Sequence, residues 1–181
     1  THVTVLDKDG NAVSFTHSLG VSSGVVTPGL GFLFNNGMCR FDPRPGRPNS
    51  VAPGKRRPSN NLPTIIFNEE LPFLILGSAG GFGIIDSVLQ TILNVIDHKM
   101  DILSAVSAPR IHCENNIISV ENRIPEETCE KLHRRGYSVK RTPYSYGWCF
   151  GNVQAVLIDR DLKNNFGASC PRRGGMALYT N

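Results

Sequence analysis

Two parts of this sequence combine residue types and spacing that could carry out chemistry. The first is Thr1, which carries a hydroxyl nucleophile and an α-amino base in one residue. An α-amino group has a pKa of about 7.7 to 8 in model peptides, so an appreciable part of it is neutral near neutral pH. The alternative is that Thr1 is only the residue at which the chain starts, because most chain ends have no catalytic role.

The second part is the glycine-rich run at 77–83, which joins an apolar segment to residues with helical apolar spacing at 84–99. A strand, a glycine turn and a helix together present backbone N–H groups at the helix N-terminus. Such a turn can bind phosphate, form an oxyanion hole, or serve only close packing of strand and helix. The run lacks the Lys-Ser/Thr of a P-loop and does not match Gly-x-Gly-x-x-Gly, so it favours nucleotide binding only weakly.

The elements that would position these residues can be read from the same sequence. A β-hairpin is expected from strands at 2–7 and 12–16 around an Asp-Gly-Asn turn, which would place Thr1 at the start of a strand. Further strands are expected at 32–34, 64–68, 73–76, 117–120, 138–141 and 153–158, and helices at 84–99, 101–107 and 125–135. Residues 35–63 read as a long functional loop or a linker, and 166–175 as turns. This order predicts an α+β or layered α/β fold in a single domain, 1–181.

The composition limits the classes of function. The chain has 181 residues, of which 40% are hydrophobic and 19% charged, and no apolar run is long enough to span a bilayer. Its net charge of +4 comes from Arg and Lys among prolines and glycines rather than aromatics, which favours solvated loop charges over nucleic-acid binding. The five cysteines form no Cys-x-x-Cys and no paired His spacing accompanies them, so a zinc site is not expected. No cofactor is expected either. The compartment stays open between cytoplasmic and periplasmic or secreted.

A series of short motifs runs in one order along the whole chain. They are a strand-initial Thr with a nearby His, Asp-Lys-Asp-Gly-Asn-Ala-Val-Ser at 7–14, Phe-Asn-Asn at 34–36, Ala-Pro-Gly-Lys-Arg at 52–56, Pro-Thr-Ile at 63–65, Gly-Ser-Ala-Gly-Gly at 77–81, Ala-Pro-Arg-Ile-His at 108–112 and Gly-Ala-Ser-x-Pro-Arg at 167–172. This series resembles the small subunit of the gamma-glutamyltransferase (gamma-glutamyltranspeptidase) family.

The resemblance implies an N-terminal nucleophile hydrolase with an αββα sandwich, made as a proenzyme that cleaves itself before the catalytic threonine. It implies a large subunit from the same precursor as partner in a heterodimer, and leaves open a dimer of heterodimers. The substrate would be a small-molecule amide. Carried over by position, Thr1 looks like the nucleophile, Ser18 like the hydroxyl residue that hydrogen-bonds it, and Gly80 and Gly81 like the oxyanion-hole pair.

The substrate-binding positions depart from the family pattern. Arg40 stands after the Asn-Asn motif that contains Asn36, where members usually have an acidic residue that holds the substrate's α-amino group. A cation there would repel a γ-glutamyl ammonium, so the sequence predicts an acyl donor with a carboxylate that Arg40 binds as a fork. Ser59 and Asn60 replace a Ser-Ser pair and can still donate hydrogen bonds. The alternative is that Arg40 is a solvent-exposed loop arginine with no role in substrate binding.

The sequence therefore leaves three functions open. They are an amidohydrolase or acyltransferase with a non-standard donor, a true gamma-glutamyltransferase, and an inactive binding subunit of the same fold. One spacing also differs, because the family generally has one residue between the nucleophile and the histidine, whereas His2 follows Thr1 directly. Thr1 is then the nucleophile of a shortened strand, or the neighbour of a preceding threonine.

Overall fold

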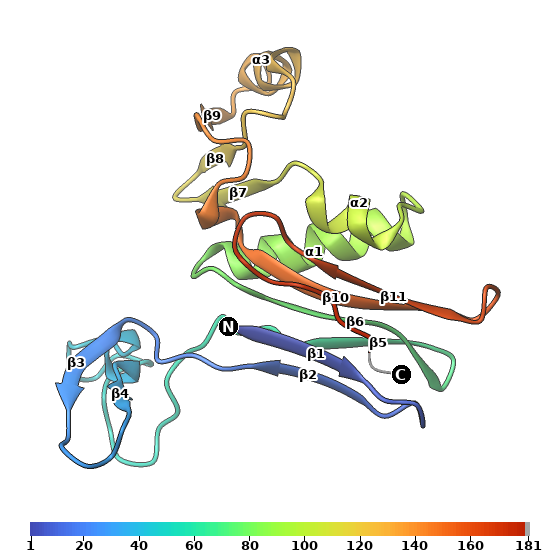
Figure 1. Ribbon diagram of the computed structural model, residues 1–181. Coiled ribbons are helices and arrows are strands. Elements are labelled where there is room, and N and C mark those ends of the chain that lie inside the picture. The colour runs from blue at the N-terminus through green and yellow to red at the C-terminus, as the bar shows by residue number, and fades with distance from the viewer. Residues whose placement is uncertain (180–181) are drawn as a thin grey trace. The chain divides into compact units, whose positions relative to one another are not determined.

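The computed structural model describes residues 1–179 and has an α+β fold (Figure 1). By its internal contacts the chain separates into two compact units. One unit contains residues 1–16 and the chain from Asn61 onward, and the other contains His17–Asn60.

The centre of the first unit is an antiparallel sheet in the order β11-β10-β6-β5. Its strands are β5 (Thr64–Asn68), β6 (Leu71–Ala79), β10 (Asn152–Asp159) and β11 (Asn164–Ser169). The middle of β6 is buried throughout, as expected for a strand covered on both faces. This sheet therefore forms the middle layer of the unit.

Two layers cover the main sheet. A hairpin of β1 (His2–Leu6) and β2 (Ala12–Thr16) lies along one face, and helices α1 (Gly83–Ile96) and α2 (Ile102–Ser107) lie on the other (Figure 1). The apolar core lies between the helices and the sheet and includes Leu74, Leu76, Val88, Val95, Ile102, Ala105, Val106, Val153, Ala155, Ala168 and Cys170. Burying these side chains is the main stabilising contribution of the layer.

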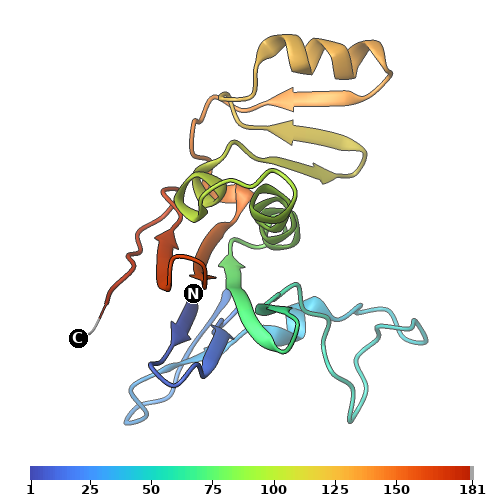
Figure 2. The ribbon, with the colours of Figure 1, turned by 90° about the vertical axis from the view of Figure 1, so that its right-hand side faces the viewer.

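A smaller sheet follows α2 in the chain. It consists of β7 (Ile111–Glu114), β8 (Ile117–Val120) and β9 (Ser138–Arg141), with β8 and β9 parallel and joined through α3 (Glu126–Arg134). Figure 2 shows this sheet and α3, in yellow to orange, stacked as two layers of their own. The 3₁₀ turn η2 (Trp148–Phe150) leads from it back to β10.

The second unit has little regular structure. It contains the strand pair β3 (Ser22–Val26) and β4 (Leu33–Asn35) and the 3₁₀ turn η1 (Gly37–Arg40). After η1 the chain is irregular up to β5, as the sequence predicts for this segment. Ser50 holds the irregular part together, because its hydroxyl lies 2.7 Å from the carbonyl oxygen of Arg44 and accepts the N–H of Arg47 at 2.6 Å.

The α+β class, the hairpin at the amino end and the strand–glycine turn–helix order are confirmed. The sequence reading missed β3 and β7, and it was wrong to assign turns to the stretch that contains β11. Gly167 made this stretch resemble a turn rather than a strand. A glycine is needed there because a β-carbon would come within 2.7 Å of the Ala177 side chain. In this chain the αββα order is present as one helical layer and two strand layers.

Candidate active site

The amino end of β1 is fixed to the main sheet through the ring of His2. The imidazole is 6% exposed and lies over Gly77 of β6, where a β-carbon would come within 2.2 Å of the ring atom Cε1. Only a residue without a side chain leaves room for the ring at this point. Gly77 therefore sets how closely the start of β1, with Thr1, approaches the main sheet.

Hydroxyl groups of β2 complete this attachment. The Ser14 hydroxyl donates to the carbonyl oxygen of Leu76 at 2.8 Å and accepts the N–H of Thr64 at 3.0 Å. His2 Nδ1 lies 2.7 Å from Thr16 Oγ1, and His2 Nε2 lies 3.3 Å from Ser14 Oγ. The buried polar groups between the hairpin and the main sheet are thus satisfied by one another.

The position of His2 predicts a pH dependence of stability. Burial, and secondly the neighbouring positive N-terminus, lowers the pKa of His2 from 6.5 to about 4. Between these values the unfolded chain binds a proton that the folded protein does not, so stability is complete above about pH 6.5 and falls as the pH approaches 4. Thermal unfolding of the full-length protein across this range should show the fall. A His2→Gln variant should flatten the profile, and an unchanged slope would contradict the assignment.

Side-chain alternation along β1 bears on the orientation of Thr1. His2 is buried, whereas Val3 and Val5 are 46% and 47% exposed. Alternation extended to Thr1 assigns its side chain to the same face as Val3, and Thr1 is exposed. A residue directly before Thr1 would share the inward face with His2.

The turn after β6 has the backbone that only glycine adopts freely. Gly80 has φ 131° and Gly81 has φ 64°. A β-carbon on Gly80 would come within 2.7 Å of the Cα of Gly151, whereas one on Gly81 would meet no atom within 4 Å. Close packing therefore accounts for Gly80, and backbone conformation alone accounts for Gly81. Helix α1 begins at Gly83, so the turn lies at its positive end.

A serine pair joins the three elements that meet at this turn. Ser78 Oγ accepts the N–H of Asn152 at 2.9 Å and the hydroxyl of Ser87 at 2.9 Å. Ser78 and Ser87 are both fully buried. The end of β6, the first turns of α1 and the start of β10 are therefore held in one arrangement.

A buried ion cluster of Glu121, Arg110 and Arg172 supports the same region. The fully buried Glu121 carboxylate accepts hydrogen bonds from Arg172 Nε at 2.8 Å and from Arg172 Nη2 at 2.6 Å. It also accepts the backbone N–H groups of Arg110 and Gly147. The Arg110 guanidinium donates to the carbonyl oxygen of Gly151 at 3.0 Å. Burial lowers the pKa of Arg110 to about 10, so this group stays charged near neutral pH.

A cavity of about 1010 Å³ opens beside Thr1. Its lining includes Thr1, His2, Ala79, Asn152, Gln154 and Arg173. Gly80 and Gly81 follow Ala79 directly in the chain. The structure thus brings the predicted nucleophile and the end of β6, from which the predicted oxyanion turn continues, to one cavity large enough for a small-molecule substrate.

The other predicted site residues, Ser18, Asn36, Arg40, Ser59 and Asn60, all lie in the second unit. Within that unit two of them come together. Ser18 Oγ accepts the N–H of Gly20 at 2.9 Å, and the N–H of Asn36 donates to the carbonyl oxygen of Leu19 at 2.9 Å. Arg40 ends the turn η1 that follows Asn36. The predicted substrate-binding residues and the predicted catalytic residue Ser18 therefore fall on one unit, and Thr1, Gly80 and Gly81 on the other.

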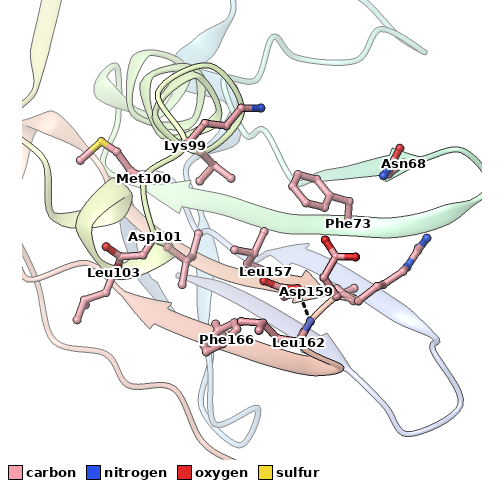
Figure 3. Close-up of a pocket in the computed structure, with 16 residues that line it drawn as sticks. Asn68, Phe73, Lys99, Met100, Asp101, Leu103, Leu157, Asp159, Leu162 and Phe166 are labelled. Carbon is pink, nitrogen blue, oxygen red and sulfur yellow. Dashed lines mark hydrogen bonds between the residues drawn. The ribbon is translucent and has the colours of Figure 1, made fainter.

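A second cavity, of about 780 Å³, lies where β6 begins and β10 ends (Figure 3). Phe73, Leu157 and Phe166 form apolar walls, and Lys99 and Asp159 are charged residues of its lining (Figure 3). Asp159 Oδ1 accepts the N–H of Leu162 at 2.9 Å and so fixes the turn after β10. None of the predicted site residues lines this cavity.

Within residues 1–179, no group of three or more His, Cys, Asp and Glu side chains is arranged to hold a metal ion. No helix in this part of the chain is long and apolar enough to cross a membrane.

Sequence reasoning missed three polar residues, namely His2 and Asn152, which line the Thr1 cavity, and Glu121 of the buried ion cluster. His2 was noted only for its spacing from Thr1, and Glu121 and Asn152 were not singled out at all. Glu121 follows an apolar strand, which is an ordinary place for a surface acid, and its burial depends on Arg172, which lies 51 residues further along the chain. No local pattern could have revealed that pair.

Comparison with known proteins agrees with this geometry. The sequence profile of the gamma-glutamyltranspeptidase family matches residues 1–180. An acylase ACY 1 proenzyme of Pseudomonas sp. (strain V22) is 40% identical over 177 residues, covering 97% of this chain and 31% of that protein. A glutathione hydrolase proenzyme of Bacillus subtilis (strain 168) is 37% identical over 184 residues, covering 100% of this chain and 31% of that protein.

A solved structure matches as well. The gamma-glutamyltranspeptidase from Pseudomonas nitroreducens complexed with L-DON superposes with a TM-score of 0.88 and 33% identity, and the match covers all of both chains. The present chain spans about a third of the length of its proenzyme relatives, as a subunit of a processed precursor would. On the strength of the profile match along residues 1–180, the chain belongs to the gamma-glutamyltranspeptidase family.

Proposed function

We propose that the protein is an N-terminal nucleophile hydrolase that cleaves an amide bond through an acyl-enzyme on Thr1 and passes the acyl group to water or to an amine. The single observation that carries the proposal is the shared cavity at Thr1 and the end of β6. Family membership supports it, because the similar proteins include a glutathione hydrolase and an acylase. A large subunit from the same precursor would complete the enzyme.

The residues have separate roles in this reaction. The Thr1 hydroxyl attacks the amide carbonyl while its α-amino group takes the proton and later gives it to the leaving nitrogen. The N–H groups of Gly80 and Gly81 face the oxyanion, a contact worth about 2.7 to 4 kcal/mol per donor in enzymes where it was measured. Ser18 would donate or accept a hydrogen bond at the nucleophile.

One specific observation favours a rival nucleophile. Alternation along β1 puts Thr1 on the exposed face, and it would put a residue before Thr1 on the buried face with His2. Trapping the acyl-enzyme of the full-length, processed protein with a slow amide donor and mapping the modified peptide by mass spectrometry decides between them. The proposal expects the acyl group on Thr1, and an acyl group on a preceding residue would overturn that assignment.

We propose further that the acyl donor carries a carboxylate and lacks the α-ammonium of a γ-glutamyl group, and that Arg40 recognises the carboxylate together with Asn36, Ser59 and Asn60. The cationic setting of Arg40 supports this, since residues 17–60 contain six Lys and Arg but Asp42 as the only acid. Asp42 forms an ion pair with Arg44, whose Nη2 lies 2.7 Å from Asp42 Oδ2. A guanidinium binds a carboxylate in a fork and repels an ammonium.

Arg40→Asp tests the donor preference. Glutaryl and γ-glutamyl p-nitroanilides differ only in the α-ammonium group, so their kcat/KM ratio isolates the charge at this position. The native protein is expected to prefer the glutaryl donor, and Arg40→Asp to reverse the preference by about tenfold or more. Arg47→Asp, the same charge change nearby, is the control. A γ-glutamyl preference in the native protein would favour a true gamma-glutamyltransferase, and absence of turnover an inactive binding subunit.

A further inference from the structure

The side-chain oxygen of Asn152 is an unsatisfied polar group at the candidate active site. Asn152 is 7% exposed, and its Oδ1 is buried and accepts no hydrogen bond from any residue that the structure describes. The same residue lines the cavity beside Thr1. Buried side-chain oxygens in native proteins almost always have a donor, so this one calls for an explanation.

The backbone fixes where this oxygen lies. Asn152 is the first residue of β10 and pairs with Ala79, the residue directly before the Gly80 turn. Its N–H donates to Ser78 Oγ at 2.9 Å. The preceding Gly151 packs closely against α1, because a β-carbon there would come within 2.3 Å of Ser87 Oγ. The Asn152 side chain thus projects from a rigid position beside the turn.

An unpaired acceptor in this place is costly unless a bound molecule supplies the donor. Leaving a buried acceptor without a partner costs about 1–3 kcal/mol, whereas a hydrogen bond made on binding removes that cost. A leucine of similar size would avoid the penalty altogether. The oxygen therefore has the properties of a substrate-binding group on a fixed backbone, satisfied only in the complex.

We propose that Asn152 Oδ1 accepts the N–H of the scissile amide. The inference rests on the proposed amide cleavage at this cavity. In a trans amide the C=O and N–H bonds point in opposite directions, so a substrate whose oxygen meets the Gly80–Gly81 turn has its N–H free for an acceptor elsewhere in the cavity. Asn152 lies at the border of that turn and carries such an acceptor.

The role is one of binding and selection, without proton transfer by Asn152. During acylation the bond from Thr1 Oγ to the carbonyl carbon forms, the bond from carbon to nitrogen breaks, and the Thr1 amine carries the proton to the leaving nitrogen. Asn152 holds the N–H already present on that nitrogen. An oxygen ester has no such N–H, so the site distinguishes amides from the matching esters.

The test compares an amide with its ester in the full-length, processed protein. The probes are glutaryl p-nitroanilide and glutaryl p-nitrophenyl ester, assayed with the native protein and Asn152→Leu. The variant is expected to lose on the order of tenfold to a hundredfold in kcat/KM on the anilide and less than about twofold on the ester. Asn152→Asp keeps an acceptor oxygen and should restore selectivity for the anilide.

Gln154→Leu is the matched control, since it removes the same type of carboxamide from the same strand and cavity. It is expected to change anilide and ester turnover by the same factor. Equal losses on both substrates for Asn152→Leu would make its role structural and overturn the inference, as would equal retention of both. Thermal unfolding serves as a fold check, because removing an unpaired acceptor should leave the melting temperature unchanged or higher.

Binding measurements separate this inference from the proposed reaction. In a Thr1→Ala background, made by co-expressing the two subunits as separate chains so that no self-cleavage is needed, calorimetric binding of the anilide and the ester is measured with and without Asn152→Leu. An anilide preference that disappears with Asn152→Leu supports the inference even when the native protein turns over neither substrate, an outcome that would refute the proposed reaction alone. The same affinity for both probes in every variant overturns the inference.

Discussion

Replacing Gly77 by alanine in the full-length protein is expected to lower kcat about a hundredfold, because the added methyl group displaces the start of β1. The new β-carbon would lie 2.2 Å from His2 Cε1 and 2.5 Å from Nε2. The ring cannot turn aside freely, since it is buried and its Nδ1 lies 2.7 Å from Thr16 Oγ1. A shift of about 1 Å at a reacting group can cost about a hundredfold in rate.

Two further variants identify the cause of this loss. His2→Ala removes the ring that the new methyl group would meet, so adding it to Gly77→Ala should restore part of the melting temperature that Gly77→Ala alone loses. Gly174→Ala is the control, because a β-carbon there would meet no atom within 4 Å. Steady-state kinetics and thermal unfolding of all four proteins check the prediction. Native kcat in Gly77→Ala would show that the position of β1 tolerates the shift.

The parts of the fold that the sequence predicted are those set by local pattern. Alternating β-branched residues around Asp-Gly-Asn define the hairpin, and the apolar spacing after Gly83 defines α1. The strand β7 could not be predicted in this way, because its four residues include His112 and Glu114 and are held by pairing with β8. Its place depends on neighbours rather than on its own sequence.

The candidate site was predictable only in its motifs. The sequence predicts Thr1 as a nucleophile and Gly80 and Gly81 as a glycine turn, but the groups that support them come from places far apart in the chain. Asn152 reaches Ser78 across 74 residues, and Arg110 reaches Gly151 across 41. Such pairs leave no periodic signal, since each partner alone resembles an ordinary polar residue.

The two units differ in how much regular structure they contain. The unit with Thr1 and the glycine turn is layered and has a continuous core, whereas the 17–60 unit consists mainly of turns and loops. Loops accept sequence change more readily than packed strands. The predicted substrate-binding positions, among them Arg40, therefore lie where sequence change is tolerated more readily than in the layered unit.

Glu121→Ala is expected to destabilise the full-length protein by about 3–5 kcal/mol, because it leaves buried positive charges without their counter-ion. Glu121 and the side chain of Arg172 are both fully buried, and their closest atoms are 2.6 Å apart. Arg123 Nη2 lies 3.0 Å from the same carboxylate. Removing this acid also leaves the backbone N–H groups of Arg110 and Gly147 without their acceptor.

An exposed glutamate provides the matched comparison for this prediction. Glu127 pairs with Lys131 at 2.6 Å on the surface of α3, where its side chain is 71% exposed, so Glu127→Ala should cost less than about 1 kcal/mol. Urea denaturation measures both variants. Arg110 donates to Glu121 through its backbone N–H and to the Gly151 carbonyl through its side chain, and Gly151 packs on Gly80. The Glu121→Ala loss should therefore be accompanied by a lower kcat, whereas Glu127→Ala should keep its full activity. Similar losses of stability in the two variants would contradict the large contribution assigned to the buried ion cluster.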